Sequence, residues 1–110
     1  MTRCLIVEDD PALGPMFATV LERTGLNVTV AHSLAEARLM SGPWDVIVAD
    51  VRLPNGDGRD LRSLHPSVPF VVISGFNVED ATAIEERYFL PKPFAPPKLQ
   101  AIVRRALGER

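Results

Sequence analysis

The stretch VIVADVRLPNG, residues 46–56, decides the fold of this 110-residue chain. Its first four residues are all apolar, which predicts a parallel strand buried on both faces of a sheet. The strand ends on Asp50, and the turn-forming residues Pro54, Asn55 and Gly56 follow. A carboxylate at the end of a buried strand requires an explanation, which the other strand-like segments provide.

Three other strand-like segments also end in polar side chains: residues 5–7 before Glu8, Asp9 and Asp10, residues 70–73 before Ser74, and residues 89–90 before Lys92. In an open parallel α/β sheet, ligands bind outside the carboxyl ends of the strands. We therefore expect these acids, the hydroxyl and the amine to meet at one edge of the sheet.

Strand-like runs alternate with helical patterns along the chain, which is typical of βαβ units. The predicted strands are residues 3–7, 27–31, 45–49, 70–73 and 88–90. The predicted helices are residues 10–25, 33–42, a short 58–64, a weak 78–86, and 96–107. The pattern predicts one α/β domain over residues 1–110, doubly wound, with a five-stranded parallel sheet in the order 2-1-3-4-5.

Local signals place the helix ends. Asp10 before Pro11 predicts the cap and the first position of the first helix, and Gly25 predicts its end. The segment from Ser33 to Glu36 is a capping box that opens the second helix. Asp57 is expected to cap the third helix rather than bind a metal.

Composition excludes several classes of protein. The net charge of −2 argues against a nucleic-acid partner, which requires a basic face. Cys4 is the one cysteine of the sequence, so we expect an inert buried thiol and no internal disulfide. No apolar run approaches the ~18 residues of a membrane span, and no leader is recognisable. We therefore expect a cytoplasmic protein without a membrane partner.

The carboxylates predict a metal site. Glu8, Asp9 and Asp50 end neighbouring strands and would repel one another without a cation. Oxygen ligands suit Mg²⁺, or Mn²⁺ in its place, and Mg²⁺ typically takes one or two carboxylates plus a phosphate oxygen. The alternative is a solvated loop of helix-capping acids, which we accept for Asp10 only, because Asp50 and Lys92 recur at matching strand ends.

Asp50 could attack phosphorus as a nucleophile and form an aspartyl phosphate. Ser74 could donate a hydrogen bond to a phosphoryl oxygen, and Lys92 could supply a compact positive charge. Taken singly, Ser74 could instead satisfy local backbone, and Lys92 could be a solvated surface lysine. Their combination at matching strand ends favours phosphoryl chemistry.

Four motifs carry a resemblance to a known family: LIVEDD at residues 5–10, VIVADVRLPNGDG at 46–58, VVISG at 71–75 and LPKPF at 90–94. Together they resemble the CheY-like receiver domain of two-component response regulators, over essentially the whole chain. The resemblance implies a flavodoxin-like fold and a phosphoacceptor rather than an enzyme, with slow autodephosphorylation.

The resemblance also implies a role for each site residue. Asp50 would be the phosphoacceptor. The metal would be held by Asp9 directly, by Glu8 through water, by Asp50 and by the backbone carbonyl of Arg52. The other implied residues are the switch hydroxyl Ser74, the lysine Lys92, and the switch aromatics Phe76 and Phe89.

The chain departs from the family pattern in two places. The stretches 50–74 and 74–92 are short, so we expect a shortened third helix and a small or irregular fourth helix. The run PFVVISGF, residues 69–76, is partly similar to the Pro-Phe-x-Phe-Ala-Thr-Gly-aromatic signature of an atypical single-domain receiver subfamily. These departures bear on the usual switch through the fourth helix and leave the phosphorylation site unchanged.

The leading hypothesis is a phosphoacceptor switch without an output domain. A sensor histidine kinase or a histidine phosphotransfer protein would donate the phosphoryl group, and the signal would leave by contact with a downstream protein or by onward phosphotransfer. Arg52 and Phe76 would limit attack by water. One alternative is a phosphorylation-independent interaction module with the same fold. Another is a hydrolase, but these usually carry an acid where Arg52 stands, and Arg52 cannot do acid–base work.

Overall fold

The computed structural model describes residues 1–75 and 86–108, and its centre is a five-stranded parallel sheet in the order β2-β1-β3-β4-β5. The strands are β1 Arg3–Val7, β2 Asn27–Ala31, β3 Val46–Asp50, β4 Phe70–Ser74 and β5 Phe89–Pro91. The predicted sheet and its order are therefore confirmed. Strands β3 and β5 begin and end one residue later than predicted, and β4 ends one residue later.

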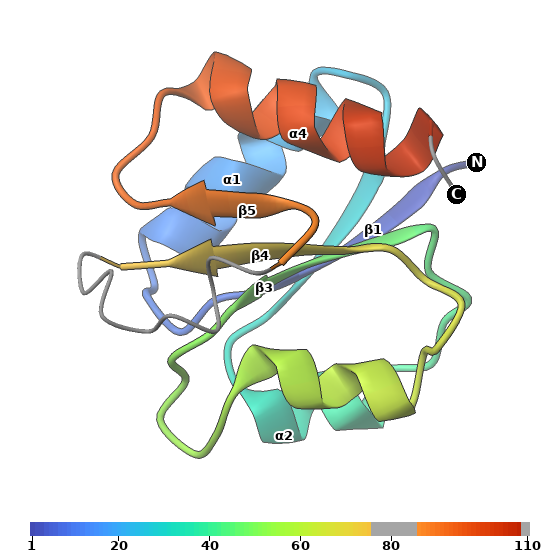
Figure 1. Cartoon of the computed structure of the whole chain (residues 1–110), viewed down its shortest axis with the longest axis vertical. Coiled ribbons are helices and arrows are strands. Elements are labelled where there is room, and N and C mark those ends of the chain that lie inside the picture. The colour runs from blue at the N-terminus through green and yellow to red at the C-terminus, as the bar shows by residue number, and fades with distance from the viewer. Residues whose placement is uncertain (76–85, 109–110) are drawn as a thin grey trace.

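Helices cover both faces of the sheet, with α1 and α4 on one face and α2 with a 3₁₀ helix, η1, on the other (Figure 1). Their bounds are α1 Leu13–Glu22, α2 Leu34–Leu39, η1 Gly58–Ser63 and α4 Pro96–Gly108. The shortened third helix is confirmed as η1. The fourth predicted helix, residues 78–86, lies outside the described residues except for its last position.

The first helix begins later than predicted. Asp10 Oδ1 accepts the backbone N–H groups of Ala12 and Leu13 at 2.8 and 3.1 Å, but the helix itself starts at Leu13. The prediction that Pro11 is the first helical residue was therefore wrong by two positions. The later start places Pro15 third in α1, where a backbone N–H has no acceptor within the helix.

The caps of the next two helices are as predicted. Ser33 Oγ accepts the backbone N–H of Glu36 at 3.0 Å and opens α2. Asp57 accepts the N–H of Arg59 at 2.9 Å and opens η1. Both helices have only six residues, so the face of the sheet that they cover carries short elements.

The hydrophobic core has a layer on each face of the sheet. All five residues of β3 are buried, as a central parallel strand requires. Alternate side chains of the strands point to opposite faces. The layer under α1 and α4 includes Ile6, Val48, Ile73, Phe17 and Leu99, and the layer under α2 and η1 includes Leu5, Ile47, Leu34 and Leu61.

Cys4 is completely buried in β1, and burial raises the pKa of its thiol to about 12. Because the thiolate is the reactive form, the folded chain should not react with a water-soluble disulfide reagent at about pH 8. One thiol should appear after unfolding in denaturant. Absorbance of the released thiol measures both states, and rapid reaction of the folded chain would contradict this burial.

Within the described residues, no helix is both long enough and apolar enough to span a bilayer.

Candidate functional site

Four of the predicted site residues lie at the carboxyl edge of the sheet. Asp50 is the last residue of β3 and Ser74 the last of β4, while Glu8 follows β1 and Lys92 follows β5. These four strands are consecutive neighbours in the parallel sheet, so their carboxyl ends lie side by side. Residues up to 84 positions apart in the chain are thereby brought into contact.

The Lys92 amine joins two buried carboxylates. Its Nζ donates to Glu8 Oε1 and Oε2, both at 2.9 Å, and to Asp50 Oδ2 at 2.8 Å. Glu8 is 1% exposed and Asp50 is 5% exposed. The backbone N–H of Lys92 donates to the Ser74 carbonyl at 2.7 Å, which fixes the segment after β5 to the end of β4.

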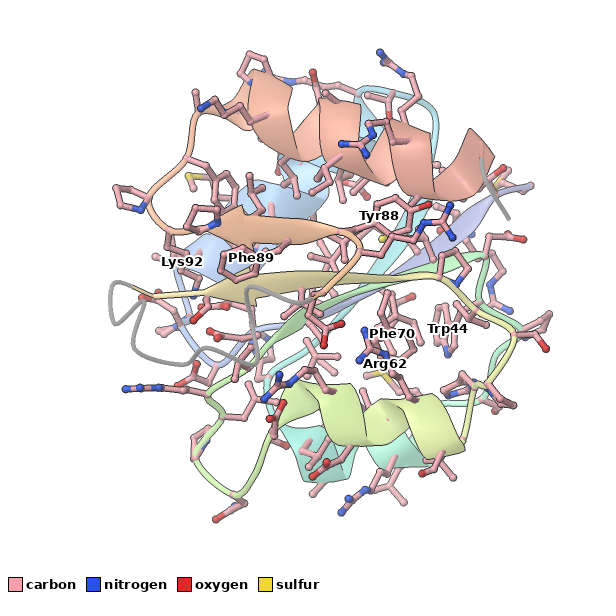
Figure 2. The ribbon with its side chains drawn as sticks, viewed as in Figure 1. Trp44, Arg62, Phe70, Tyr88, Phe89 and Lys92 are labelled. Atoms are coloured by element: carbon pink, nitrogen blue, oxygen red, sulfur yellow. The ribbon has the colours of Figure 1, made fainter. Side chains whose placement is uncertain are left out.

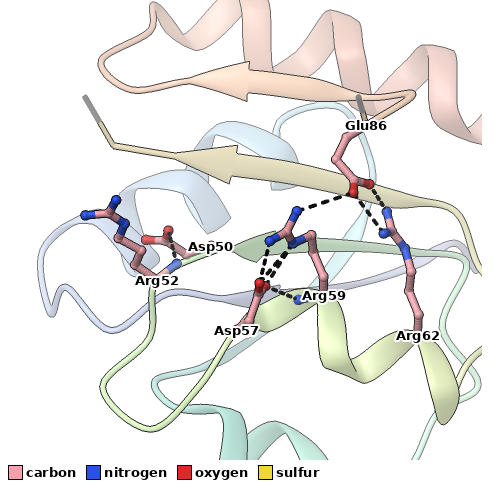
Figure 3. A network of polar contacts seen from close by, with 6 residues as sticks. All are labelled: Asp50, Arg52, Asp57, Arg59, Arg62 and Glu86. Carbon is pink, nitrogen blue, oxygen red and sulfur yellow. Dashed lines mark hydrogen bonds and ion pairs between the residues drawn. The ribbon is translucent and has the colours of Figure 1, made fainter. Parts of the chain in front are cut away.

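The other oxygen of Asp50 is held by the backbone. The N–H of Arg52 donates to Asp50 Oδ1 at 3.1 Å, while the Arg52 side chain is exposed (Figure 3). Each oxygen of the carboxylate therefore has a donor, one neutral and one charged, and the group has a defined orientation.

Burial raises the pKa of Glu8 to about 7, and Asp50 adds to this effect while the hydrogen bond from Lys92 opposes it. Burial by itself lowers the pKa of Lys92, but its hydrogen bonds to Asp50 and Glu8 outweigh burial and raise it. Lys92 therefore stays charged at neutral pH, while the two acids compete for one cation.

The predicted acidic set is brought together. Glu8, Asp9 and Asp50 each offer a carboxylate oxygen within 4.8 Å of the others. Three carboxylates beside one lysine amine leave an excess of two negative charges when all are ionised. Asp9 is exposed, so an ion bound there could keep water ligands as Mg²⁺ does. The donor set and the charge balance both fit a divalent cation with oxygen ligands.

The positions of the predicted switch residues give less direct support for their roles than the contacts of Lys92 and the acids do. The Ser74 hydroxyl donates to the Gly75 carbonyl at 3.3 Å. This is the local backbone hydrogen bond that was expected if Ser74 had no role in phosphoryl chemistry. Phe89 is half-buried and packs against Val72 and against Val51, the residue that follows Asp50. Phe76 lies outside the described residues.

The loop after Asp50 folds back against its own strand. Leu53 and Gly56 exchange backbone hydrogen bonds at 2.9 and 3.2 Å. Gly58 then lies so close to β3 that a Cβ added to it would be 2.3 Å from the Asp50 carbonyl oxygen. This role of Gly58 was not predicted from the sequence, where the available signal was two glycines within three residues.

A network of ion pairs connects this loop to the segment before β5 (Figure 3). Asp57 Oδ2 accepts Arg59 Nε at 3.0 Å, and Arg59 Nη1 lies 3.7 Å from Glu86 Oε2. Arg62 Nη1 donates to the same Glu86 oxygen at 3.1 Å, and its other Nη atom donates to Oε1. The sequence did not predict this network, because charged helix positions usually face solvent.

The sequence profile of one protein family, the response regulator receiver domain, matches residues 4–104. The KDP operon transcriptional regulatory protein KdpE of Escherichia coli is 38% identical, over 97% of this chain and 52% of that protein. Sensor kinase CckA of Brucella abortus is 35% identical, over 96% of this chain and 12% of that protein. The chain thus spans about half of one of these relatives and far less of the other.

The solved receiver domain of the Francisella response regulator 1452 has a similar structure. Its TM-score to this chain is 0.85 at 26% sequence identity, and the match covers 99% of this chain and 98% of that one.

Proposed function

Because the chain belongs to the response regulator receiver family, whose members accept a phosphoryl group on an aspartate, we propose that Asp50 is the phosphoacceptor of this chain. The observation that carries the proposal is the contact of one lysine amine with Asp50 and Glu8, at 2.8 and 2.9 Å. This contact supports the proposal because it brings together, at one edge of the sheet, the carboxylate that would act as the nucleophile, a second acid and a cation.

In the proposed reaction, a carboxylate oxygen of Asp50 forms a bond to phosphorus. The bond between phosphorus and the imidazole nitrogen of a phosphohistidine breaks, and its electron pair stays on that nitrogen. Lys92 then pairs with a phosphoryl oxygen. The Ser74 hydroxyl gives up its hydrogen bond to the Gly75 carbonyl and donates to another phosphoryl oxygen. The N–H of Arg52 keeps the Asp50 carboxylate oriented throughout.

Asp9, Asp50 and the backbone carbonyl of Arg52 would hold Mg²⁺ or Mn²⁺ directly, and Glu8 would do so through water. A bound divalent ion would neutralise charge on the transferring phosphoryl group. The three carboxylates within 4.8 Å of one another support this assignment.

Phosphorylation would act by shifting a two-state equilibrium. Inward movement of Ser74 and Lys92 would bias the packing of Phe89 and, in our proposal, of Phe76. The donor would be a sensor histidine kinase or a histidine phosphotransfer protein in the cytoplasm, and the receiver of the signal would be a further protein. The exposed Arg52 side chain and Phe76 would slow attack by water on the aspartyl phosphate.

Intact mass after incubation with acetyl phosphate tests the proposal. We expect the purified chain to gain one phosphoryl group with Mg²⁺ present and none with a chelator, because the excess negative charge at the site must be compensated. If Mg²⁺ fails to bind and no phosphoryl group is added, a phosphorylation-independent interaction module becomes the better description.

Asp9→Asn should weaken Mg²⁺ binding by about tenfold or more, because it removes a charged ligand from the acidic set. Isothermal calorimetry measures the affinity. Asp10→Asn is the matched control, because it removes the same charge at the next residue. The Asp10 side chain accepts the Ala12 N–H and is not part of the predicted metal site. Equal losses in both variants would mean that Mg²⁺ responds to net charge and not to this ligand set.

A further inference from the structure

The ion pairs of Figure 3 join η1 to the segment that precedes β5, and we call them the η1–β5 network: Asp57, Arg59, Arg62 and Glu86. Its two acids and two arginines balance in charge. The side chains of Glu86 and Arg59 are only 12% and 18% exposed. Solvent and salt therefore screen these ion pairs less than they screen a fully exposed salt bridge.

The first end of the network lies against the proposed phosphoacceptor. Asp57 opens η1 by accepting the backbone N–H of Arg59 at 2.9 Å. The next residue, Gly58, is so close to β3 that an added Cβ would lie 2.3 Å from the Asp50 carbonyl oxygen. The start of η1 is thus fixed in position relative to Asp50.

The other end of the network leads into β5. Glu86 stands three residues before Phe89, which packs against Val51, the residue after Asp50. Lys92 follows β5, and its amine contacts Asp50 at 2.8 Å. Figure 2 shows Phe89 and Lys92 toward the same end of the sheet. Glu86 therefore holds the beginning of the strand that brings these two side chains to the site.

The backbone gives β5 little support of its own. The strand has three residues, and it lies at the edge of the sheet beside β4. Its last residue, Pro91, has no N–H to donate. The position of so short an edge strand depends on the contacts at its two ends, which are Glu86 before it and Lys92 after it.

Addition of a phosphoryl group to Asp50 requires the Lys92 amine to leave Asp50 Oδ2 and follow the new oxygens. We infer that the η1–β5 network opposes the movement of β5 that results, and so favours the unphosphorylated arrangement. Contacts that are made in one arrangement and weakened in the other shift the equilibrium toward the first. The inference rests on the proposed role of Asp50, and it makes Glu86 and Arg62 positioning residues that act through β5.

Equilibrium binding of beryllium trifluoride, a mimic of the phosphoryl group, tests the inference in the presence of Mg²⁺. The methyl resonances of Val51 and Val72 report the binding. Glu86→Gln should bind the mimic about fivefold more tightly than the wild-type chain. Arg62→Gln should change the affinity in the same direction by a smaller factor, because Arg59 stays 3.7 Å from Glu86. Both variants should unfold at lower urea concentration than the wild-type chain.

The two substitutions remove opposite charges, so a response to net charge alone would change the affinity in opposite directions. Asp60→Asn is the matched control for Glu86→Gln, because it removes an exposed acid of η1. It should change the affinity less than twofold. Both substitutions in one chain should add little to the effect of Glu86→Gln alone, because they break the same ion pairs.

Three results would overturn the inference: no gain in affinity in either variant, opposite changes in Glu86→Gln and Arg62→Gln, or an equal gain in Asp60→Asn. A network with a structural role only would lower stability without raising the affinity. If Glu86→Gln does not fold, Arg62→Gln decides the test, since its side chain is 43% exposed.

The wild-type chain separates this inference from the proposal on which it rests. If the wild-type chain does not bind beryllium trifluoride with Mg²⁺, the proposed role of Asp50 fails, and this inference fails with it. If the wild-type chain binds the mimic and the variants bind it no more tightly, only the inference about the η1–β5 network is wrong.

Discussion

Asp50→Asn should carry no phosphoryl group under conditions that label the wild-type chain with acetyl phosphate and Mg²⁺. An amide has nearly the shape of the carboxylate but is not the nucleophile that forms an acyl phosphate. Its oxygen can still accept the Arg52 N–H, which lies 3.1 Å from Asp50 Oδ1 in the wild type. Lys92 keeps both hydrogen bonds to Glu8. The variant should therefore fold and lose only its chemistry.

Intact mass shows the loss, and thermal unfolding shows that the variant is folded. Asp60→Asn is the matched control, because Asp60 is an exposed acid of η1 outside the acidic set. The control should be labelled as the wild type is. Full labelling of Asp50→Asn at another residue would show that the assignment of the acceptor is wrong.

Gly58→Ala adds a methyl group near the site, and we expect it to destabilise the fold more than any other such addition there. The new Cβ would lie 2.3 Å from the Asp50 carbonyl oxygen and 2.9 Å from the Ala49 Cβ. The first of these is a backbone atom of a buried central strand, so it cannot rotate away. We expect a loss of about 3 kcal/mol in the free energy of unfolding, equivalent to a fall of about 15 °C in Tm.

Unfolding in urea measures this loss. Gly75→Ala is the control, since a Cβ added to Gly75 meets no atom of residues 1–75 or 86–108 within 4 Å and the residue has no positive φ. It should change the free energy of unfolding by less than about 0.5 kcal/mol. A Gly58→Ala chain as stable as the control would mean that the loop after β3 can move away from the strand.

The convergence at the carboxyl edge could be predicted because parallel strands of known order end side by side. The four apolar runs that end in polar side chains were sufficient to predict that Glu8, Asp50 and Lys92 lie at one edge of the sheet. The exact strand ends were harder to predict. Residues 45 and 88 were assigned to strands and fall just outside β3 and β5, because the last hydrogen bonds of a strand depend on the neighbouring strand's register.

The pairing within the site could not be predicted from the sequence. Residue spacing indicated that Lys92 would be near the acids, but not that its amine would contact both oxygens of Glu8. The same limit applies to the ion pairs of Glu86 with Arg59 and Arg62, which join segments 24 or more residues apart. Side-chain contacts across elements depend on packing details that no local pattern contains.

The parallel arrangement of the sheet also has a consequence for how many proteins this chain can hold at once. Strand β3 has five residues, so roughly 16 Å of buried sheet separates its carboxyl edge from its amino-terminal edge. Molecules bound at the two edges would approach from opposite directions without competing for space. A phosphoryl donor docked at Asp50, as proposed above, would therefore leave the opposite edge of the sheet accessible to a second protein.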